Sequence, residues 1–128
     1  METVNKKTIM VVDDDLDTVE IIRMKLEAAG FKVVTARDGY ECVAKCQEIE
    51  PDLLIVDVMM PKISGFKVVK LLKSDEQLKD MPIIILTARV QKADRQLARD
   101  IQANGYITKP FSPEGILREV KQLLNKEA

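Results

Sequence analysis

Five short apolar runs alternate along this chain with longer segments of helical periodicity. The runs span residues 9–12, 31–35, 53–56, 83–86 and 105–108. The first, third and fourth are almost wholly apolar, which is typical of strands covered on both faces of a parallel sheet. Strands joined by helices run parallel through right-handed crossovers. We therefore predict an α/β fold, a three-layer α/β/α sandwich around a five-stranded parallel sheet.

The segments between the runs carry recognisable helix boundaries. Asp38, Ser64 and Ser112 are placed to cap helix N-termini, whereas Gly30 and Pro51 are placed to end helices. Apolar spacing then predicts which side chains face the sheet. These are Leu16, Val19, Ile22, Leu26 and Ala29 in the first helix, Cys42 and Cys46 in the second, Val68, Leu71 and Leu72 in the third, Ala93, Leu97 and Ile101 in the fourth, and Ile116, Val120, Leu123 and Leu124 in the fifth.

Length and composition limit the classes of protein. A chain of 128 residues predicts one domain, and the last helix runs almost to the end, so we expect no output domain beyond it. The net charge of −1 gives no basic excess of the kind that nucleic-acid modules carry. No stretch approaches the roughly 20 apolar residues of a membrane span, and residues 1–7 lack the apolar core of a signal peptide. We expect a cytoplasmic protein.

Two residue counts exclude whole chemistries. The sequence has no histidine, so catalytic triads, histidine zinc sites and histidine phosphocarriers are ruled out. Its two cysteines, Cys42 and Cys46, are spaced i, i+4 and have no further thiol to complete a metal site.

Polar side chains follow four of the predicted strands. In an open parallel sheet the carboxyl ends of the strands form the ligand-binding edge. The residues that follow them are Asp13, Asp14 and Asp15 with Asp17 close behind, then Asp57, then Thr87 and Ala88, and finally Lys109 and Pro110. We predict that the fold gathers these carboxylates, one hydroxyl and one ammonium at a single edge.

Such a cluster suits phosphoryl chemistry. Adjacent carboxylates repel one another, and a hard divalent cation such as Mg2+ relieves that repulsion through oxygen ligands. The cation, Lys109 and Thr87 would together cradle the oxygens of a phosphoryl group. A carboxylate can itself be the nucleophile and form an acyl phosphate, and the transition state needs positioning and charge neutralisation more than a base. A phosphoacceptor aspartate fits this set of residues without histidine.

The motifs resemble the receiver domain of two-component response regulators over essentially the whole chain. The matching segments are Val11-Val12-Asp13-Asp14, residues 51–61 with Asp57 at the end of an apolar run, Gly65, Leu86-Thr87-Ala88, and Lys109-Pro110-Phe111. Each motif alone is weak, but five in this order are specific. The resemblance implies the flavodoxin-like strand order 2-1-3-4-5.

The resemblance also implies roles for the residues around the acceptor. Asp57 looks like the phosphoacceptor. Asp13 and Asp14 resemble the acidic pair that holds Mg2+, with the backbone carbonyl of Met59 as a further ligand. Thr87 and Lys109 would bind phosphoryl oxygens.

Further positions match the family's switch and its control of phosphate loss. Tyr106 occupies the aromatic switch position, working with Thr87, and Lys109-Pro110 resembles the family's cis peptide. Met59 and Arg89 would flank the path of the hydrolytic water. Asp15 and Asp17 are extra acids, for which a helix-start role is the simpler interpretation.

Partners follow from the same resemblance. With no histidine of its own, the protein would receive its phosphoryl group from a phosphohistidine on a sensor kinase or a histidine phosphotransfer protein. It would then act on a downstream protein rather than directly on nucleic acid or membrane. Lys92, Arg95 and Arg99, at helical spacing, form either a solvated helix face or part of that partner surface.

Three other functions fit this set of residues less well. A haloacid-dehalogenase-like phosphatase also uses a strand-end aspartate nucleophile with Mg2+, but its motif fails at Asp17, and it remains the alternative. A flavodoxin-like electron carrier would need a phosphate-binding loop where three aspartates stand. An EF-hand calcium loop would need glycine and glutamate where Thr18 and Met24 stand.

Overall fold

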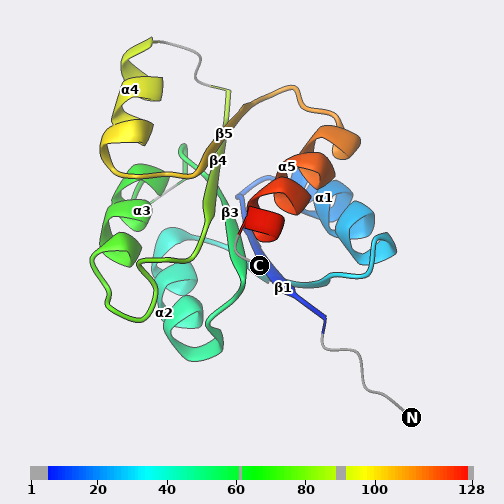
Figure 1. Ribbon diagram of the computed structural model, residues 1–128. Helices are drawn as coiled ribbons and strands as arrows, with labels where there is room; N and C mark the ends of the chain where they lie inside the picture. The colour runs from blue at the N-terminus through cyan, green and yellow to red at the C-terminus, as the bar shows by residue number, and fades with distance from the viewer. Residues whose placement is uncertain (1–5, 61, 89–91, 127–128) are drawn as a thin grey trace.

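The computed structural model describes residues 6–60, 62–88 and 92–126. Five strands and five helices alternate along the chain (Figure 1). They are β1 (Thr8–Val12), α1 (Leu16–Ala28), β2 (Lys32–Ala36), α2 (Gly39–Ile49), β3 (Leu53–Asp57), α3 (Gly65–Lys73), β4 (Ile83–Thr87), α4 (Lys92–Asp100), β5 (Gly105–Thr108) and α5 (Pro113–Lys126). All strand pairs are parallel, in the order β2-β1-β3-β4-β5. The predicted fold class and strand order are confirmed.

The sheet separates two hydrophobic cores, because alternate residues of each strand point to opposite faces. Helices α1 and α5 cover one face, and α2, α3 and α4 cover the other (Figure 1). Along β1, for example, Ile9 and Val11 enter the α1/α5 core, whereas Met10 and Val12 enter the opposite one. The three central strands, β1, β3 and β4, are buried almost throughout, which explains their unbroken apolar sequences.

The predicted helix boundaries agree with the observed caps. The Asp38 side chain accepts a hydrogen bond from the Glu41 amide at 2.9 Å, and the Ser112 hydroxyl accepts one from the Gly115 amide at 2.9 Å. Gly30, which follows α1, has a φ of 97°, the left-handed conformation that glycine tolerates best.

Several predicted core faces are wrong. Leu16 and Ala29 at the ends of α1 are exposed, and so is Leu71 of α3, where Val69 is buried instead. Leu16 is the first residue of α1 and Ala29 is its C-cap, so both lie at the ends of the helix, outside the buried stripe of Val19, Ile22 and Leu26. In α4 the buried side chains are Asp94 and Ala98, whereas Ala93 and Leu97 are exposed; Ile101, just beyond the helix, is partly buried. The cysteines of α2 are buried as predicted, and so are Ile116, Val120 and Leu123 of α5, while Leu124 is partly buried.

Strand register determines how the polar strand ends meet. Val12 of β1 is level with Val56 of β3, so Asp13 and Asp57 follow at the same height. Asp57 is in turn level with Leu86, and Thr87 is level with Thr108 of β5, which directly precedes Lys109. The register therefore brings four segments that are far apart in sequence to one edge. Within the described residues, no helix is long and apolar enough to cross a membrane.

Gly65, the first residue of α3, is packed directly against the end of β3. Its amide donates to the Val58 carbonyl at 2.9 Å, and a Cβ at this position would lie 2.3 Å from the Asp57 carbonyl oxygen. That neighbour is backbone, so a side chain here forces the β3–α3 connection to shift.

We predict that Gly65→Ala destabilises the protein by about 2 kcal/mol in urea unfolding, although alanine is the better helix former. Gly115→Ala is the control, because its new Cβ meets only the Ser112 hydroxyl, a side-chain atom. It should change stability by less than about 1 kcal/mol. A Gly65→Ala protein as stable as the wild type would contradict the packing described for this connection.

Candidate functional site

One ammonium group holds two carboxylates together at the carboxyl edge of the sheet. Lys109 Nζ lies 2.8 Å from Asp13 Oδ2 and 3.4 Å from Asp57 Oδ2. Asp13 is 1% exposed and Asp57 4% exposed, so both carboxylates are almost out of reach of bulk solvent. Asp13 directly follows β1, Asp57 ends the neighbouring strand β3, and Lys109 reaches both from the end of β5.

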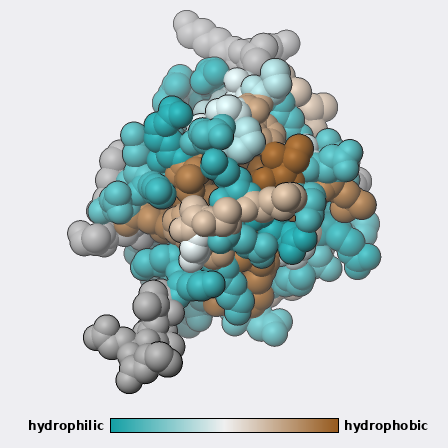
Figure 2. All heavy atoms as spheres, turned by 90° about the vertical axis from the view of Figure 1, so that its right-hand side faces the viewer, coloured by the Kyte–Doolittle hydropathy of each residue, from teal (hydrophilic) through white to brown (hydrophobic). Residues whose placement is uncertain are grey.

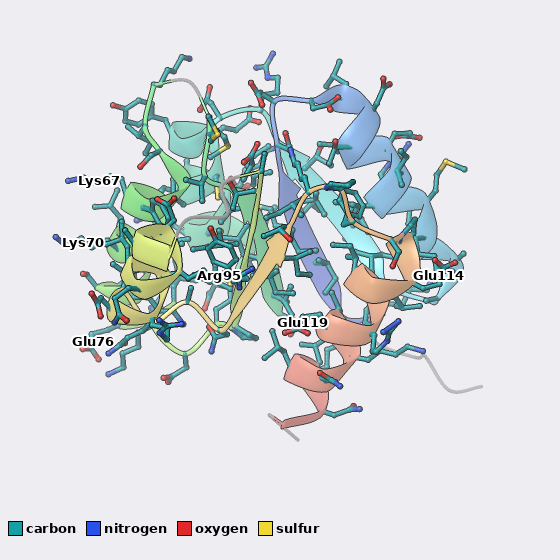
Figure 3. All side chains as sticks on the ribbon, turned by 90° about the horizontal axis from the view of Figure 1, so that it is seen from above. Lys67, Lys70, Glu76, Arg95, Glu114 and Glu119 are labelled. Carbon is teal, nitrogen blue, oxygen red and sulfur yellow. The ribbon has the colours of Figure 1, made fainter. Side chains whose placement is uncertain are left out.

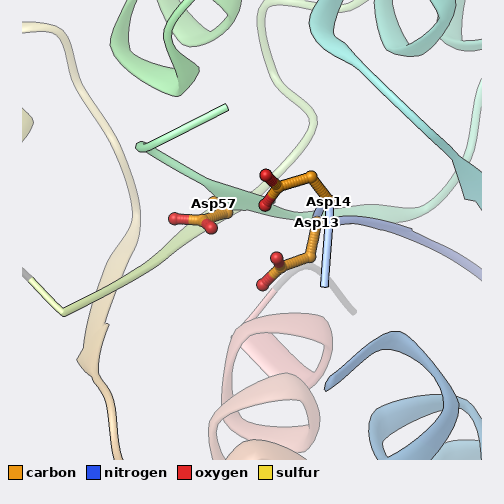
Figure 4. Close-up of side chains that lie close together, drawn as sticks. All are labelled: Asp13, Asp14 and Asp57. Carbon is orange, nitrogen blue, oxygen red and sulfur yellow. The ribbon is translucent and has the colours of Figure 1, made fainter. Parts of the chain in front are cut away.

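A third carboxylate completes the cluster. One carboxylate oxygen each from Asp13, Asp14 and Asp57 lie within 4.8 Å of one another, and Asp14 is exposed where the other two are buried (Figure 4). Three carboxylates and one ammonium leave the cluster with a net negative charge. The donor set is all oxygen and opens to solvent on the Asp14 side, which fits Mg2+ well.

Backbone amides fix the orientation of the two buried carboxylates. The Asp15 amide donates to Asp13 Oδ1 at 2.9 Å, and the Met59 amide donates to Asp57 Oδ1 at 3.0 Å. Each buried carboxylate therefore has one oxygen bound by its own loop and the other directed toward Lys109. This arrangement follows from the tight turns just after β1 and β3.

The protonation equilibria reflect burial opposed by charge pairing. Burial raises the pKa of Asp13, and the neighbouring charge of Asp57 raises it further, while the Lys109 hydrogen bond acts in the other direction without cancelling them. Burial acts to lower the pKa of Lys109, but its contacts with Asp13 and Asp57 outweigh burial and raise that pKa above the usual value. An acid whose pKa is raised in the folded state lowers the stability of the protein as the pH rises through that pKa. Ionised Asp13 therefore costs folding free energy at neutral pH, whereas protonated Lys109 contributes stability.

The remaining predicted site residues lie around this cluster. Thr87, at the end of β4, is fully buried, and its carbonyl accepts the Lys109 amide at 2.8 Å. The Lys109–Pro110 peptide is cis, as the resemblance implies. Tyr106 is half-buried on β5, and Met59 is 58% exposed beside Asp57. Arg89 lies outside the described residues.

The extra acids belong to the start of α1. Asp15 is its N-cap, accepting hydrogen bonds from the Asp17 amide at 3.1 Å and from the Thr18 hydroxyl at 2.9 Å. Those bonds lower the pKa of Asp15, the Thr18 hydroxyl contributing most. The simpler interpretation of Asp15, a helix-start carboxylate, is therefore confirmed, and Asp17 lies in the first turn.

Sequence analysis missed an apolar groove beside the cluster. It has a volume of about 340 Å³ and is lined by Thr18, Ile21, Lys109, Pro110, Phe111 and Pro113. It belongs to the α1/α5 side of the molecule, where Figure 2 shows hydrophobic side chains among hydrophilic ones. Among these residues, helical periodicity marks only Ile21 as an exposed apolar side chain. The groove itself forms where α1 meets the loop after β5, and a local pattern does not predict that meeting.

Comparisons with known proteins agree with this geometry. The family model of the response regulator receiver domain matches residues 9–121. The alkaline phosphatase synthesis transcriptional regulatory protein PhoP of Bacillus subtilis is 40% identical over 95% of this chain, which spans 50% of PhoP. The chain thus spans about half the length of such curated transcriptional regulators. The polar-differentiation response regulator DivK of Brucella ovis is 34% identical over 92% of this chain and 96% of DivK.

Solved structures give the same result. The chemotaxis response regulator CheY4 of Vibrio cholerae superimposes with a TM-score of 0.88 at 34% identity, over 93% of this chain and 99% of that one. The phosphorylated cyanobacterial phytochrome response regulator RcpA superimposes with a TM-score of 0.85 at 28% identity, over 97% of each chain. These matches support a signalling receiver and give no support to the phosphatase alternative. The chain belongs to the family of response regulator receiver domains, the phosphoacceptor modules of two-component systems.

Proposed function

We propose that Asp57 is the phosphoacceptor and that the cluster around it catalyses its phosphorylation. The observation that carries this proposal is the position of the Asp57 carboxylate. It ends a fully buried central strand and lies 3.4 Å from Lys109 Nζ, with Asp13 and Asp14 beside it.

The chemistry is a phosphoryl transfer between two nucleophiles. An Asp57 carboxylate oxygen attacks phosphorus and forms an acyl phosphate, while the bond from phosphorus to the donor's imidazole nitrogen breaks and the electron pair stays with the imidazole. Lys109 exchanges its contact with Asp57 for one with a phosphoryl oxygen. Thr87 supplies a hydroxyl to another of these oxygens.

Mg2+ would be held by the carboxylates of Asp13, Asp14 and Asp57 and by the Met59 carbonyl. When bound, it neutralises charge shared by the carboxylates and the incoming phosphoryl group. The raised pKa of Asp13 and the net negative charge of the cluster both support a cation there, because among the described residues Lys109 is the cation paired with these carboxylates.

Thr87 and Tyr106 would convert phosphorylation into a surface change. Thr87 moves toward the phosphoryl group, and Tyr106 fills the space that it leaves, which biases a two-state surface around α4 and β5. The donor is a phosphohistidine on a sensor kinase or a histidine phosphotransfer protein, and the output is a contact with a downstream protein. The single-domain architecture and the cytoplasmic location stay predictions.

The first test is covalent labelling. Acetyl phosphate with Mg2+ should add the mass of one phosphoryl group to the protein, and chelating the metal should prevent it. Asp57→Asn should abolish labelling, whereas Asp17→Asn, which alters an exposed carboxylate at the start of α1, should leave it intact. An Asp57→Asn protein that labels as well as the wild type would refute the assignment.

The second test uses repulsion within the apo cluster. Asp14→Ala removes one of three neighbouring carboxylates while it leaves the contact between Asp13 and Lys109 in place. We predict a melting temperature a few degrees above that of the wild type in the absence of Mg2+, together with loss of Mg2+ binding. Asp17→Ala should change neither property. A lower melting temperature with Mg2+ binding retained would count against this metal site.

The third test concerns the lifetime of the acyl phosphate. Hydrolysis needs a water in line with the phosphorus, and Met59, exposed beside Asp57, is apolar and cannot orient one. We predict slow loss of phosphate. Met59→Asn combined with Arg89→Glu should speed it about tenfold, equivalent to roughly 1.4 kcal/mol of barrier.

Phosphate release after removal of the donor measures this rate. Met24→Asn, which alters an exposed methionine on α1, is the matched control and should leave the rate unchanged. Equal rates in the double variant and the wild type would mean that these two positions do not control water access.

A further inference from the structure

A cation–π contact joins α4 to β5. The guanidinium carbon of Arg95 lies 4.8 Å from the centre of the Tyr106 ring, within the range of about 6 Å over which such contacts act. In Figure 3, Arg95 extends from α4 toward β5. Arg95 is exposed, whereas Tyr106 is half-buried and packs against the core on this face of the sheet. The contact therefore ties α4 to the strand that carries Lys109 at its end.

Helix α4 has little apolar packing to fix its position. Among its described side chains, the buried ones are Asp94, 5% exposed, and Ala98, 3% exposed, while Leu97 is 41% exposed. An alanine and a carboxylate bury little apolar surface, so the hydrophobic contribution to holding this helix is small. Helix α5 on the opposite face, by comparison, buries a run of large side chains, namely Ile116, Val120 and Leu123. A surface contact thus has a larger share in placing α4 than it would in placing α5.

We propose that Arg95 is a positioning residue that holds the Tyr106 ring against α4 and so favours the unphosphorylated form. This inference rests on the proposed function, in which Tyr106 moves toward the space that Thr87 leaves. A ring that moves inward leaves the guanidinium, so the contact is present in one form and lost in the other. A contact made in one form alone shifts the equilibrium toward that form by its full free energy.

The sign of the effect separates this role from a general charge effect. Beryllium fluoride, a phosphoryl mimic, binds as an anion. Removing a positive charge from the same side of the molecule would weaken anion binding if the charge acted only through its field. Removing the contact with Tyr106 should instead tighten binding, because the active form becomes easier to reach. The two explanations therefore predict opposite changes in affinity.

The experiment is a calorimetric titration with beryllium fluoride in the presence of Mg2+. We expect Arg95→Gln to bind the mimic about two- to five-fold more tightly than the wild type, the range that an exposed cation–π contact allows. Arg95→Lys keeps a cation over the ring and should restore affinity toward the wild-type value. Arg99→Gln is the matched control, an exposed arginine one turn later whose guanidinium donates to Gln96, and it should not tighten binding.

Tyrosine fluorescence gives a readout of the ring itself. The chain has no tryptophan and two tyrosines, so Tyr40→Phe, which alters a residue that is exposed on α2, leaves Tyr106 as the only tyrosine. In this background Arg95→Gln should move the emission of the free protein toward that of the protein saturated with beryllium fluoride. Arg99→Gln should not.

The outcomes distinguish the two proposals. Wild-type protein that fails to bind beryllium fluoride would refute the proposed function, and this inference with it. Wild-type binding combined with an Arg95→Gln variant that binds equally or more weakly, or whose Tyr106 emission does not move, would overturn the role of Arg95 alone.

Discussion

The contact of Lys109 with Asp13 and Asp57 is the interaction on which the rest of this site depends. Two buried carboxylates side by side would repel each other strongly unless a positive charge were close. One ammonium, 2.8 Å from the first and 3.4 Å from the second, supplies that charge. It can do so because the parallel register brings the ends of β1, β3 and β5 to one edge of the sheet.

The negative charge of this carboxylate cluster is only partly neutralised, and this suits the proposed phosphoryl chemistry. Within the described part of the chain one cation, Lys109, is paired with this group of three carboxylates, and burial keeps the pKa of Asp13 raised despite the Lys109 hydrogen bond. A site fully neutralised by its own side chains would attract a divalent cation only weakly. It would then also bind a phosphoryl group weakly, because that binding depends on the metal. The free energy that ionised Asp13 costs the fold is thus linked to ligand binding at the same edge.

The site and the α4–β5 surface share one strand. Tyr106 and Lys109 lie three residues apart on and just beyond β5, so a change at the proposed acceptor would be close to the side chain that contacts α4. On the opposite face, α1 and α5 are held by large buried side chains and by an ion pair of 3.3 Å between Lys25 and Glu114. The molecule therefore combines a firmly packed face with a face where one helix buries little apolar surface, an asymmetry that suits the proposed two-state surface.

The sequence by itself determined the element order, the buried central strands, the helix caps and the identity of the polar residues at the strand ends. These features are local, because each depends on periodicity or on a residue type at one turn. The tertiary structure decided which face of α4 packs inward, since a stripe of Ala93, Leu97 and Ile101 competes with one of Asp94, Ala98 and Ile101 and periodicity cannot choose between them. It also decided the contacts of Lys109 with Asp13 and of Arg95 with Tyr106. Both contacts depend on strand order and register, which bring together segments that are far apart along the chain. A local sequence pattern cannot predict such contacts.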